Sequence, residues 1–410
     1  MSITKLEQLA QGMPTYENNK WKKVVEIFDR MPASKQAGAV IAFEKASEHW
    51  PSRVDGWSGI NGSPDYEMRR APLHWVKEVY TGNHQPKHRL IRILESPRRP
   101  LRDQKLPQVI SPDAELRNVA QVGFDQVKPP GTFLKLFKGD GPWQHWKVFR
   151  LWYCELKPTQ LKLVAKIDWA ALESLVLTQN WIRADGAKAL AKAPGLEGLK
   201  ALHLGLNGIG LEGAQHLAGA SWLRSLERIN LEYNELSDEA FTCLAADGAL
   251  SQMRELHMPN NPLGRAPESW LGELPNLELL DIEQTGFNEA GLSTLISKLP
   301  ETIKSVKVDN TPFTDAHAQA LVDTGIELTG LDIVGTQLTE AGVTTLLQAP
   351  SMQKLERIRF GNGFGKAHLK QIADGALPKL KWFWWLGTET EDGLMEVTKA
   401  DPRLAKLYPY

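Results

Sequence analysis

The sequence predicts an α/β solenoid of stacked strand–helix units, preceded by a separate α-rich N-terminal segment. Two observations carry this prediction. A nine-residue apolar pattern, read first at Leu172, Leu175, Leu177 and Asn180, recurs eight further times, and its last copy starts at Leu380. Successive copies start 24–27 residues apart, a period that accommodates one short strand and one short helix. The first third of the chain does not carry the pattern.

Each copy predicts a short strand with one buried face, because the apolar residues at positions four and six alternate with polar neighbours. Position nine turns the chain out of the strand. There an Asn side chain can bond backbone groups that the turn leaves unpaired. The first four copies have Asn180, Asn207, Asn234 and Asn261. The later copies have Thr285, Thr311, Thr336, Gly363 and Thr388, and a hydroxyl can do part of the same job with fewer bonds.

A short helix is expected after most of the strands. Four polar residues follow the turns and can serve as N-caps: Ser237, Asn288, Thr314 and Thr339. Small and apolar residues then follow at helical spacing, as in Leu292, Leu295 and Ile296. The copy that starts at Met253 is the exception, because Pro262, Gly264 and Pro267 argue against a regular helix there.

This strand–helix unit resembles the leucine-rich repeats of the ribonuclease-inhibitor-like class, over roughly residues 146–400. The resemblance implies a horseshoe with a parallel sheet on the concave side and helices on the convex side. An upstream copy, Trp146-x-x-Phe149-x-Leu151-x-x-Cys154, is in register and is expected to be the N-terminal capping repeat. Residues 141–410 would then form about ten units. The style of Glu289-Ala-Gly291 after the turn resembles bacterial members of the class.

Residues 1–140 are expected to form a small, basic, α-rich domain that also caps the first repeats, with helices near residues 20–30 and 34–50. Residues 1–145 have 22 Lys and Arg against 16 Asp and Glu, whereas the rest of the chain has 26 against 33. Residues 69–105 concentrate ten basic residues against three acidic ones. This segment could contact nucleic acid, but a solvated surface or docking against the acidic repeats accounts for it without a nucleic-acid-binding motif. We therefore do not expect nucleic acid to be a partner.

No catalytic, metal or cofactor site is predicted. His84 and His88 have a spacing that metal ligands use on a helix, but Pro86 lies between them and no third ligand is evident. Cys154 and Cys243 lack a catalytic context, and two cysteines build no disulfide framework. No apolar run is long enough to span a membrane, and the N-terminus has no apolar leader core. We expect a cytoplasmic protein that is not an enzyme and needs no cofactor.

The concave face is the predicted binding surface of a non-catalytic protein–protein interaction module. In the later copies the residues at position five alternate in sign, and they are expected to satisfy one another across the strands: Asp281, Lys307, Asp332 and Arg359. Position seven has Glu232, Glu283 and Asp309, with no basic residue in their own row. These carboxylates predict an acidic strip suited to a basic partner.

Two aromatic groups extend the predicted surface. Trp382 and Trp384 lie beside Arg357 and Arg359 at one end, while Trp152 and Tyr153 lie near the other. Trp and Arg are enriched in binding hot spots. Alternatively, residues 123–145 cover the first aromatic group and the C-terminal tail covers the second. The predicted partner-binding residues are Trp152, Tyr153, His203, Glu232, Tyr233, His257, Glu283, Asp309, Arg357, Arg359, Trp382 and Trp384.

The expected partner is another protein. The chain is expected to bind it as a monomer, and no membrane is expected to take part. An alternative is that residues 1–140 carry an enzymatic or nucleic-acid-binding activity, with the repeats as a targeting module.

Overall fold

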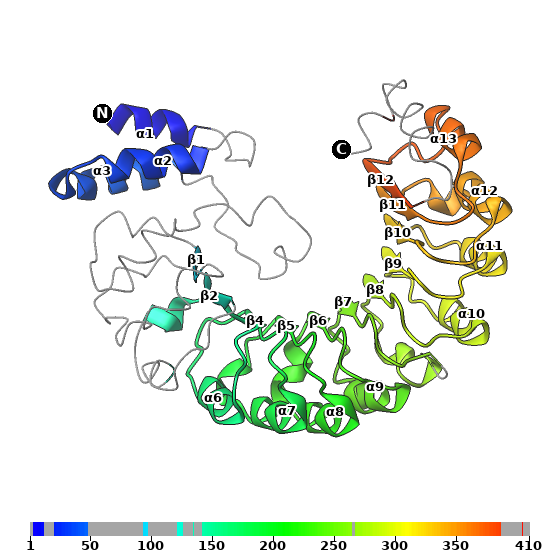
Figure 1. Cartoon of the computed structure of the whole chain (residues 1–410), viewed down its shortest axis with the longest axis horizontal. Coiled ribbons are helices and arrows are strands. Elements are labelled where there is room, and N and C mark those ends of the chain that lie inside the picture. Colours follow the sequence, from blue (N-terminus) through cyan, green and yellow to red (C-terminus); the bar gives the residue numbers. More distant parts are fainter. Residues whose placement is uncertain are drawn as a thin grey trace. The chain divides into compact units, whose positions relative to one another are not determined.

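A computed structural model describes residues 3–11, 20–47, 93–96, 121–125, 134, 142–264, 267–386 and 404. They fall into two compact units, Met1–Asn207 and Gly208–Tyr410, which are described one at a time. In both units short parallel strands alternate with helices (Figure 1).

The first unit contains three N-terminal helices and a parallel sheet. The helices are α1 (Ile3–Ala10), α2 (Lys20–Asp29) and α3 (Ala33–Ala46). The strands pair in sequence order: β1 (Ile93–Ser96), β2 (Gln121–Asp125), β3 (Val148–Trp152), β4 (Ser174–Val176) and β5 (Ala201–His203). Two α-helices, α6 (Pro158–Val164) and α7 (Arg183–Ala191), and the 3-10 helices η3 (Pro142–His145) and η4 (Pro194–Leu196) complete the described elements. The helices expected near residues 20–30 and 34–50 are present as α2 and α3.

The second unit repeats the same alternation (Figure 1). Its strands are β6 (Arg228–Asn230), β7 (Glu255–His257), β8 (Leu279–Asp281), β9 (Ser305–Lys307), β10 (Gly330–Asp332), β11 (Arg357–Phe360) and β12 (Trp382–Trp385). Each pairs in parallel with the next. Its α-helices are α8 (Gly210–Ala218), α9 (Asp238–Ala245), α10 (Glu289–Ser297), α11 (Asp315–Asp323), α12 (Glu340–Gln348) and α13 (Lys366–Ala373). The 3-10 helices η5 (Ser221–Ser225), η6 (Ala246–Gly248), η7 (Pro267–Ser269), η8 (Leu271–Glu273) and η9 (Pro350–Met352) fill the connections.

The ten predicted strands are present, one for each copy of the pattern, as β3 to β12. The expectation that the Trp146 copy caps the array was wrong in one respect, because β2 pairs with β3 on its upstream side and β1 pairs with β2. The apolar pattern missed β2 because its buried residues are Val122 and Phe124 rather than leucines. Most of the basic segment 69–105 lies outside the described residues.

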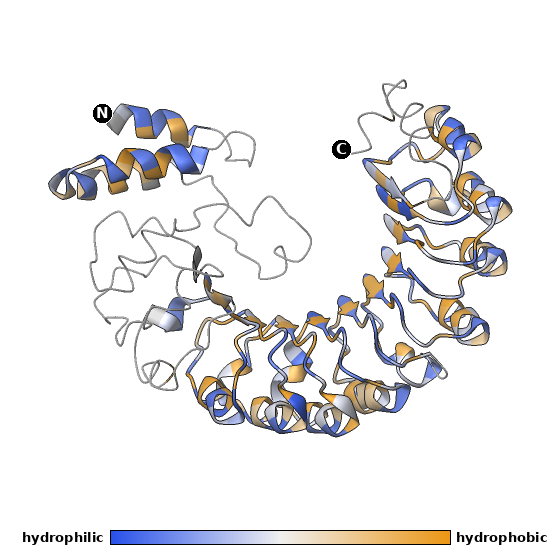
Figure 2. Ribbon diagram, in the orientation of Figure 1, coloured by the Kyte–Doolittle hydropathy of each residue, from blue (hydrophilic) through white to orange (hydrophobic). Residues whose placement is uncertain are grey.

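The core lies between the strands and the helices of each unit. Leu175, Leu177, Leu202 and Leu204, at positions four and six, have no exposed surface. The repeat helices each combine hydrophobic and hydrophilic residues, as expected for helices that cover a core (Figure 2). Burial of this apolar surface is the main force that holds successive repeats together.

The position-nine asparagines form the predicted bonds. The Asn207 side-chain carbonyl accepts hydrogen bonds from the backbone N–H groups of Asn180 at 2.8 Å and Ile182 at 3.3 Å. Its amide nitrogen donates to the carbonyl oxygens of Leu177 at 3.0 Å and Leu204 at 2.7 Å. The later hydroxyls make fewer bonds, as predicted: Thr285, Thr311 and Thr336 each donate to the carbonyl three residues earlier. Thr388 lies outside the described residues.

Helix capping also follows the prediction at three sites. Ser237, Asn288 and Thr339 accept hydrogen bonds from the first-turn backbone at 3.4, 2.8 and 3.2 Å. At Thr314 the backbone N–H instead donates to the His317 Nδ1 at 3.0 Å. After β7 the chain forms the 3-10 helices η7 and η8 in place of an α-helix, in agreement with the prolines and glycine there.

Candidate functional site

The candidate site is a set of charged and aromatic side chains at positions three, five and seven of the second unit. They belong to the residues that alternate with the buried leucine positions, so they lie on the side of the sheet away from the core. We call this set the polar face. Its members are Glu232, His257, Asp281, Glu283, Lys307, Asp309, Asp332, Arg357, Arg359, Trp382 and Trp384.

The first cluster of the polar face is centred on Asp281. Because β7, β8 and β9 are in register, His257, Asp281 and Lys307 lie side by side. The Asp281 Oδ2 lies 3.1 Å from the His257 Nδ1 and 3.0 Å from the Lys307 Nζ. Burial opposes ionisation of this carboxyl, but the hydrogen bond from His257 and the charge of Lys307 hold the pKa of Asp281 below its usual value.

The second cluster joins two carboxylates to two arginines. The Arg357 Nη1 lies 3.0 Å from each carboxylate oxygen of Asp332. The Arg359 Nη1 donates to the Asp309 Oδ2 at 2.7 Å and lies 3.7 Å from the Asp332 Oδ2. The Arg359 guanidinium also lies 5.3 Å from the ring centre of Trp384. This arginine is therefore held by two carboxylates and one aromatic ring.

Asp309 is a buried acid of the polar face with a strongly raised pKa. Its side chain is 1% exposed, and its Oδ1 accepts a hydrogen bond from the Val334 backbone at 2.6 Å. Burial and the nearby charge of Asp332 raise the pKa of Asp309 to about 7, although Arg359 favours the ionised form. The Asp309 carboxyl group therefore changes between its protonated and ionised forms near neutral pH.

Glu232 and Glu283 carry charge that the cluster does not neutralise. Both are partly exposed. Burial raises the pKa of each, and the negative charge of Asp281 raises it further. Within the described residues, neither carboxylate forms an ion pair, since Lys307 pairs with Asp281 and the arginines pair with Asp309 and Asp332. The polar face therefore has excess negative potential around these two side chains.

The pairing across the sheet follows the sequence expectation in part. At position five, Lys307 pairs with Asp281 and Arg359 approaches Asp332, as the alternating signs predict. The sequence reasoning did not anticipate that Arg359 also crosses to the position-seven row and contacts Asp309. The acidic strip is consequently narrower than predicted, and Glu232 and Glu283 remain as its accessible members.

The predicted aromatic residues Trp152, Tyr153, Trp382 and Trp384 are all partly exposed. In the second unit, Trp382 and Trp384 are partly exposed, and Tyr233 is 49% exposed. In the first unit, the Arg150 guanidinium carbon lies 5.5 Å from the ring centre of Trp152. The ring centres of Tyr153 and Trp181 are 5.5 Å apart.

Two residues of the first unit differ from the sequence picture. His203 has no exposed surface, so it offers no contact area to a partner. Trp181, which the sequence reasoning did not select, is 51% exposed. It follows Asn180, the position-nine residue of its repeat, and has a backbone φ of 51°, which the apolar pattern does not encode. Its aromatic character in a turn after the strand was the available signal.

Comparison with known families agrees with the fold. The family model described as Leucine Rich repeat matches residues 171–191 and 199–218. These matches agree with the parallel strand–helix units, which have the arrangement of a leucine-rich-repeat fold. No curated protein matches the chain significantly. Leucine-rich repeats are commonly protein-interaction modules and are typically not enzymes.

Two further properties, concerning membrane-spanning helices and metal-binding clusters, apply to the part of the chain that the structure describes. None of its helices has the length and apolar character needed to cross a membrane. Nor do its His, Cys, Asp and Glu side chains come together in groups of three or more that could hold a metal ion. The histidines at 84 and 88 lie outside the described residues.

Proposed function

We propose that this protein is a non-catalytic binding module whose polar face takes a basic segment of another protein. The observation that carries the proposal is geometric: Glu232 and Glu283 are partly exposed and, within the described residues, form no ion pair. A carboxylate in such a position is stabilised when a cation approaches it. A Lys or Arg from a partner would supply that charge.

The ion pairs within the polar face also favour a basic partner over an acidic one. Its basic side chains are already engaged by carboxylates: Lys307 by Asp281, Arg357 by Asp332, and Arg359 by Asp309. An acidic partner would have to displace one of these pairs, two of which involve a carboxylate that is 1% exposed. A basic partner meets Glu232 and Glu283 without such a cost.

The aromatic end of the polar face adds apolar contact area to the charge. Trp384 is fixed by its contact with Arg359, and Trp382 is its neighbour two residues earlier on β12. Large, rigid aromatic side chains contribute contact area at a low cost in conformational entropy. A segment that combines Lys or Arg with apolar side chains therefore fits the polar face best.

The proposal is tested with the full-length chain and the Glu232→Gln/Glu283→Gln double variant, which keeps side-chain volume and removes both charges. The matched control is Glu273→Gln/Glu301→Gln, in which both residues are exposed and lie outside the polar face. The probe is a labelled peptide in which Lys and Leu alternate, measured by fluorescence anisotropy at low salt. We expect the polar-face variant to bind about tenfold more weakly, and the control to bind within about twofold of the unmodified chain.

Equal loss of affinity in both variants would show that only net charge matters, and the proposal would fail.

If the proposal holds, a natural partner is sought by capture from a lysate, with the unmodified chain, the polar-face variant and the control variant as baits. Candidates retained by the unmodified chain and the control, but lost from the Glu232→Gln/Glu283→Gln bait, are taken forward to purified binding assays.

A further inference from the structure

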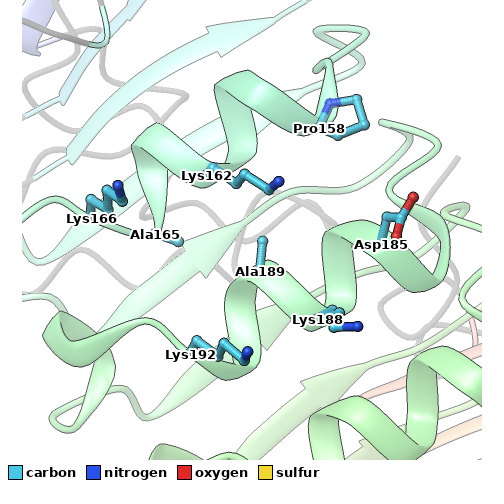
Figure 3. Close-up of a pocket in the computed structure, with 8 residues that line it drawn as sticks. All are labelled: Pro158, Lys162, Ala165, Lys166, Asp185, Lys188, Ala189 and Lys192. Carbon is cyan, nitrogen blue, oxygen red and sulfur yellow. The ribbon is translucent and has the colours of Figure 1, made fainter.

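A positively charged groove lies on the first unit between α6 and α7 (Figure 3). Its cavity volume is about 450 Å³. Its described lining has four lysines, Lys162, Lys166, Lys188 and Lys192, with Asp185 as the single carboxylate. The remaining lining residues are two alanines and a proline, so the floor is small and apolar. The groove is separate from the polar face, which belongs to the second unit.

The lysines occupy identical places in two successive repeats. Lys162 and Lys166 follow Trp146 at the same spacings at which Lys188 and Lys192 follow Leu172. The corresponding positions in the repeats of the second-unit α-helices are Gln215 and Gly219, Thr242 and Ala246, Ser293 and Ser297, Gln319 and Asp323, Thr344 and Gln348, and Gln371 and Gly375. Paired lysines are therefore not a general property of these helices. They are concentrated at α6 and α7, with Lys162 and Lys188 in the helices and Lys166 and Lys192 just after their last residues.

The character of the lining restricts the ligand. Four ammonium groups against one carboxylate favour an anion. The described residues that line the groove include no aromatic ring on which a nucleobase could stack and no arginine to grip a phosphate with two parallel hydrogen bonds. Lysines act as point charges on flexible stems, so they can follow carboxylates at several places along a chain without a fixed bidentate geometry.

The spacing of the lysines indicates the form of that chain. On each wall of the groove the two lysines are four residues apart, or about 6 Å along a helix axis. Alternate side chains of an extended peptide repeat at about 6.8 Å. We propose that the groove binds an extended acidic segment of another protein, with carboxylates at alternate positions placed between the two pairs of lysines.

The test uses the full-length protein and a labelled peptide in which Glu and Ser alternate. The groove variants are Lys188→Gln/Lys192→Gln and Lys162→Gln/Lys166→Gln. The control, Lys298→Gln/Lys366→Gln, removes the same charge from exposed sites of the second unit. We expect each groove variant to weaken binding about tenfold at low salt, and the control to change it by less than about twofold. Lys188→Arg/Lys192→Arg, which keeps the charge, is expected to retain binding. Circular dichroism and thermal unfolding confirm that each variant is folded.

Three results would overturn the proposal. The first is equal affinity of the unmodified chain and both groove variants for the alternating peptide. The second is equal affinity for a peptide of the same composition with its glutamates in one block, since the spacing would then be irrelevant. The third is groove-dependent binding of inorganic polyphosphate or an oligonucleotide without binding of the acidic peptide. Glu232→Gln/Glu283→Gln is expected to leave acidic-peptide binding unchanged, which separates this proposal from that for the polar face.

Discussion

Arg359 reaches back across one intervening strand to donate to the carboxylate of Asp309, fifty residues earlier in the chain, at 2.7 Å. Strand β10 lies between the strands that carry or precede these two residues. The contact joins the position-five and position-seven rows, and it pairs a buried acid of the polar face with a guanidinium.

Replacing Arg359 by Met should destabilise the second unit. The change leaves Asp309 without its ion-pair partner in a site where it is 1% exposed, and well above pH 7, where the carboxyl is ionised, an uncompensated buried charge is costly. We expect a loss of about 2 kcal/mol, below the range for fully buried pairs because Arg359 itself is 31% exposed. Urea denaturation measures the loss. In an Asp309→Asn background the same change should cost clearly less, and an undiminished cost would show that the pair is not the cause.

The protonation of Asp309 should make stability depend on pH. Its pKa is about 7 in the folded chain against a usual value of 3.8, so the folded state binds the proton more tightly. The resulting stabilisation is fully present below about pH 4 and is lost as the pH rises through about 7. The slope contributed by this group is at most about 1.4 kcal/mol per pH unit. Thermal unfolding between these pH values gives the dependence of stability on pH for the unmodified chain and for Asp309→Asn. The two dependences should differ by the contribution of Asp309, and parallel dependences would contradict the prediction.

Replacing Asn207 by Ala should destabilise the first unit by about 2–4 kcal/mol. The change removes the Asn207 side chain from the buried backbone N–H of Asn180 and the carbonyl of Leu204, and it leaves the Leu177 carbonyl with its bond from the Asn180 amide alone. Thr311→Val is the comparison in the second unit, since that hydroxyl donates one hydrogen bond, to Val308. We expect a loss of about 1 kcal/mol there. Denaturant midpoints test the order, and equal losses would mean that the number of bonds does not decide stability.

Gly264 should tolerate no side chain. Its φ is +120°, and an added Cβ would lie 2.4 Å from the Cα of Phe287. Gly375 is a close control, with a φ of +114° and no atom within 4 Å of an added Cβ. We expect Gly375→Ala to cost about 1 kcal/mol from backbone strain alone, and Gly264→Ala to cost about 3 kcal/mol because of the overlap. Thermal unfolding distinguishes the two, and similar melting temperatures would show that Phe287 moves away at little cost.

The strand positions were predictable because burial imposes a strict period on the sequence. Leu175 and Leu177 illustrate this, since a residue of the wrong type at either position would leave a hole in the core. β2 was not predictable from the same pattern, because Val122 and Phe124 satisfy the same burial with other side chains.

The polar face was predictable as a set of positions but not as a set of contacts. Row-by-row reasoning pairs residues on adjacent strands, whereas the Arg359 side chain is long enough to reach beyond its nearest neighbour. The exposure of Trp181 depends on turn dihedral angles, and these are not contained in the leucine periodicity. The alternative activity of residues 1–140 stays a prediction, because the basic segment lies largely outside the described residues.

The exchange of asparagine for threonine at position nine divides the array into two kinds of neighbour relationship. Asn207 and Asn261 bond backbone groups of the preceding repeat, to Leu177 and Leu231 for example, so opening one repeat removes bonds from the next. The hydroxyls of Thr311 and Thr336 instead donate to carbonyls of their own repeats. In a linear array, cooperativity arises from coupling between neighbours. The asparagine repeats should accordingly exchange their amide hydrogens in larger groups, while the threonine repeats can open one at a time.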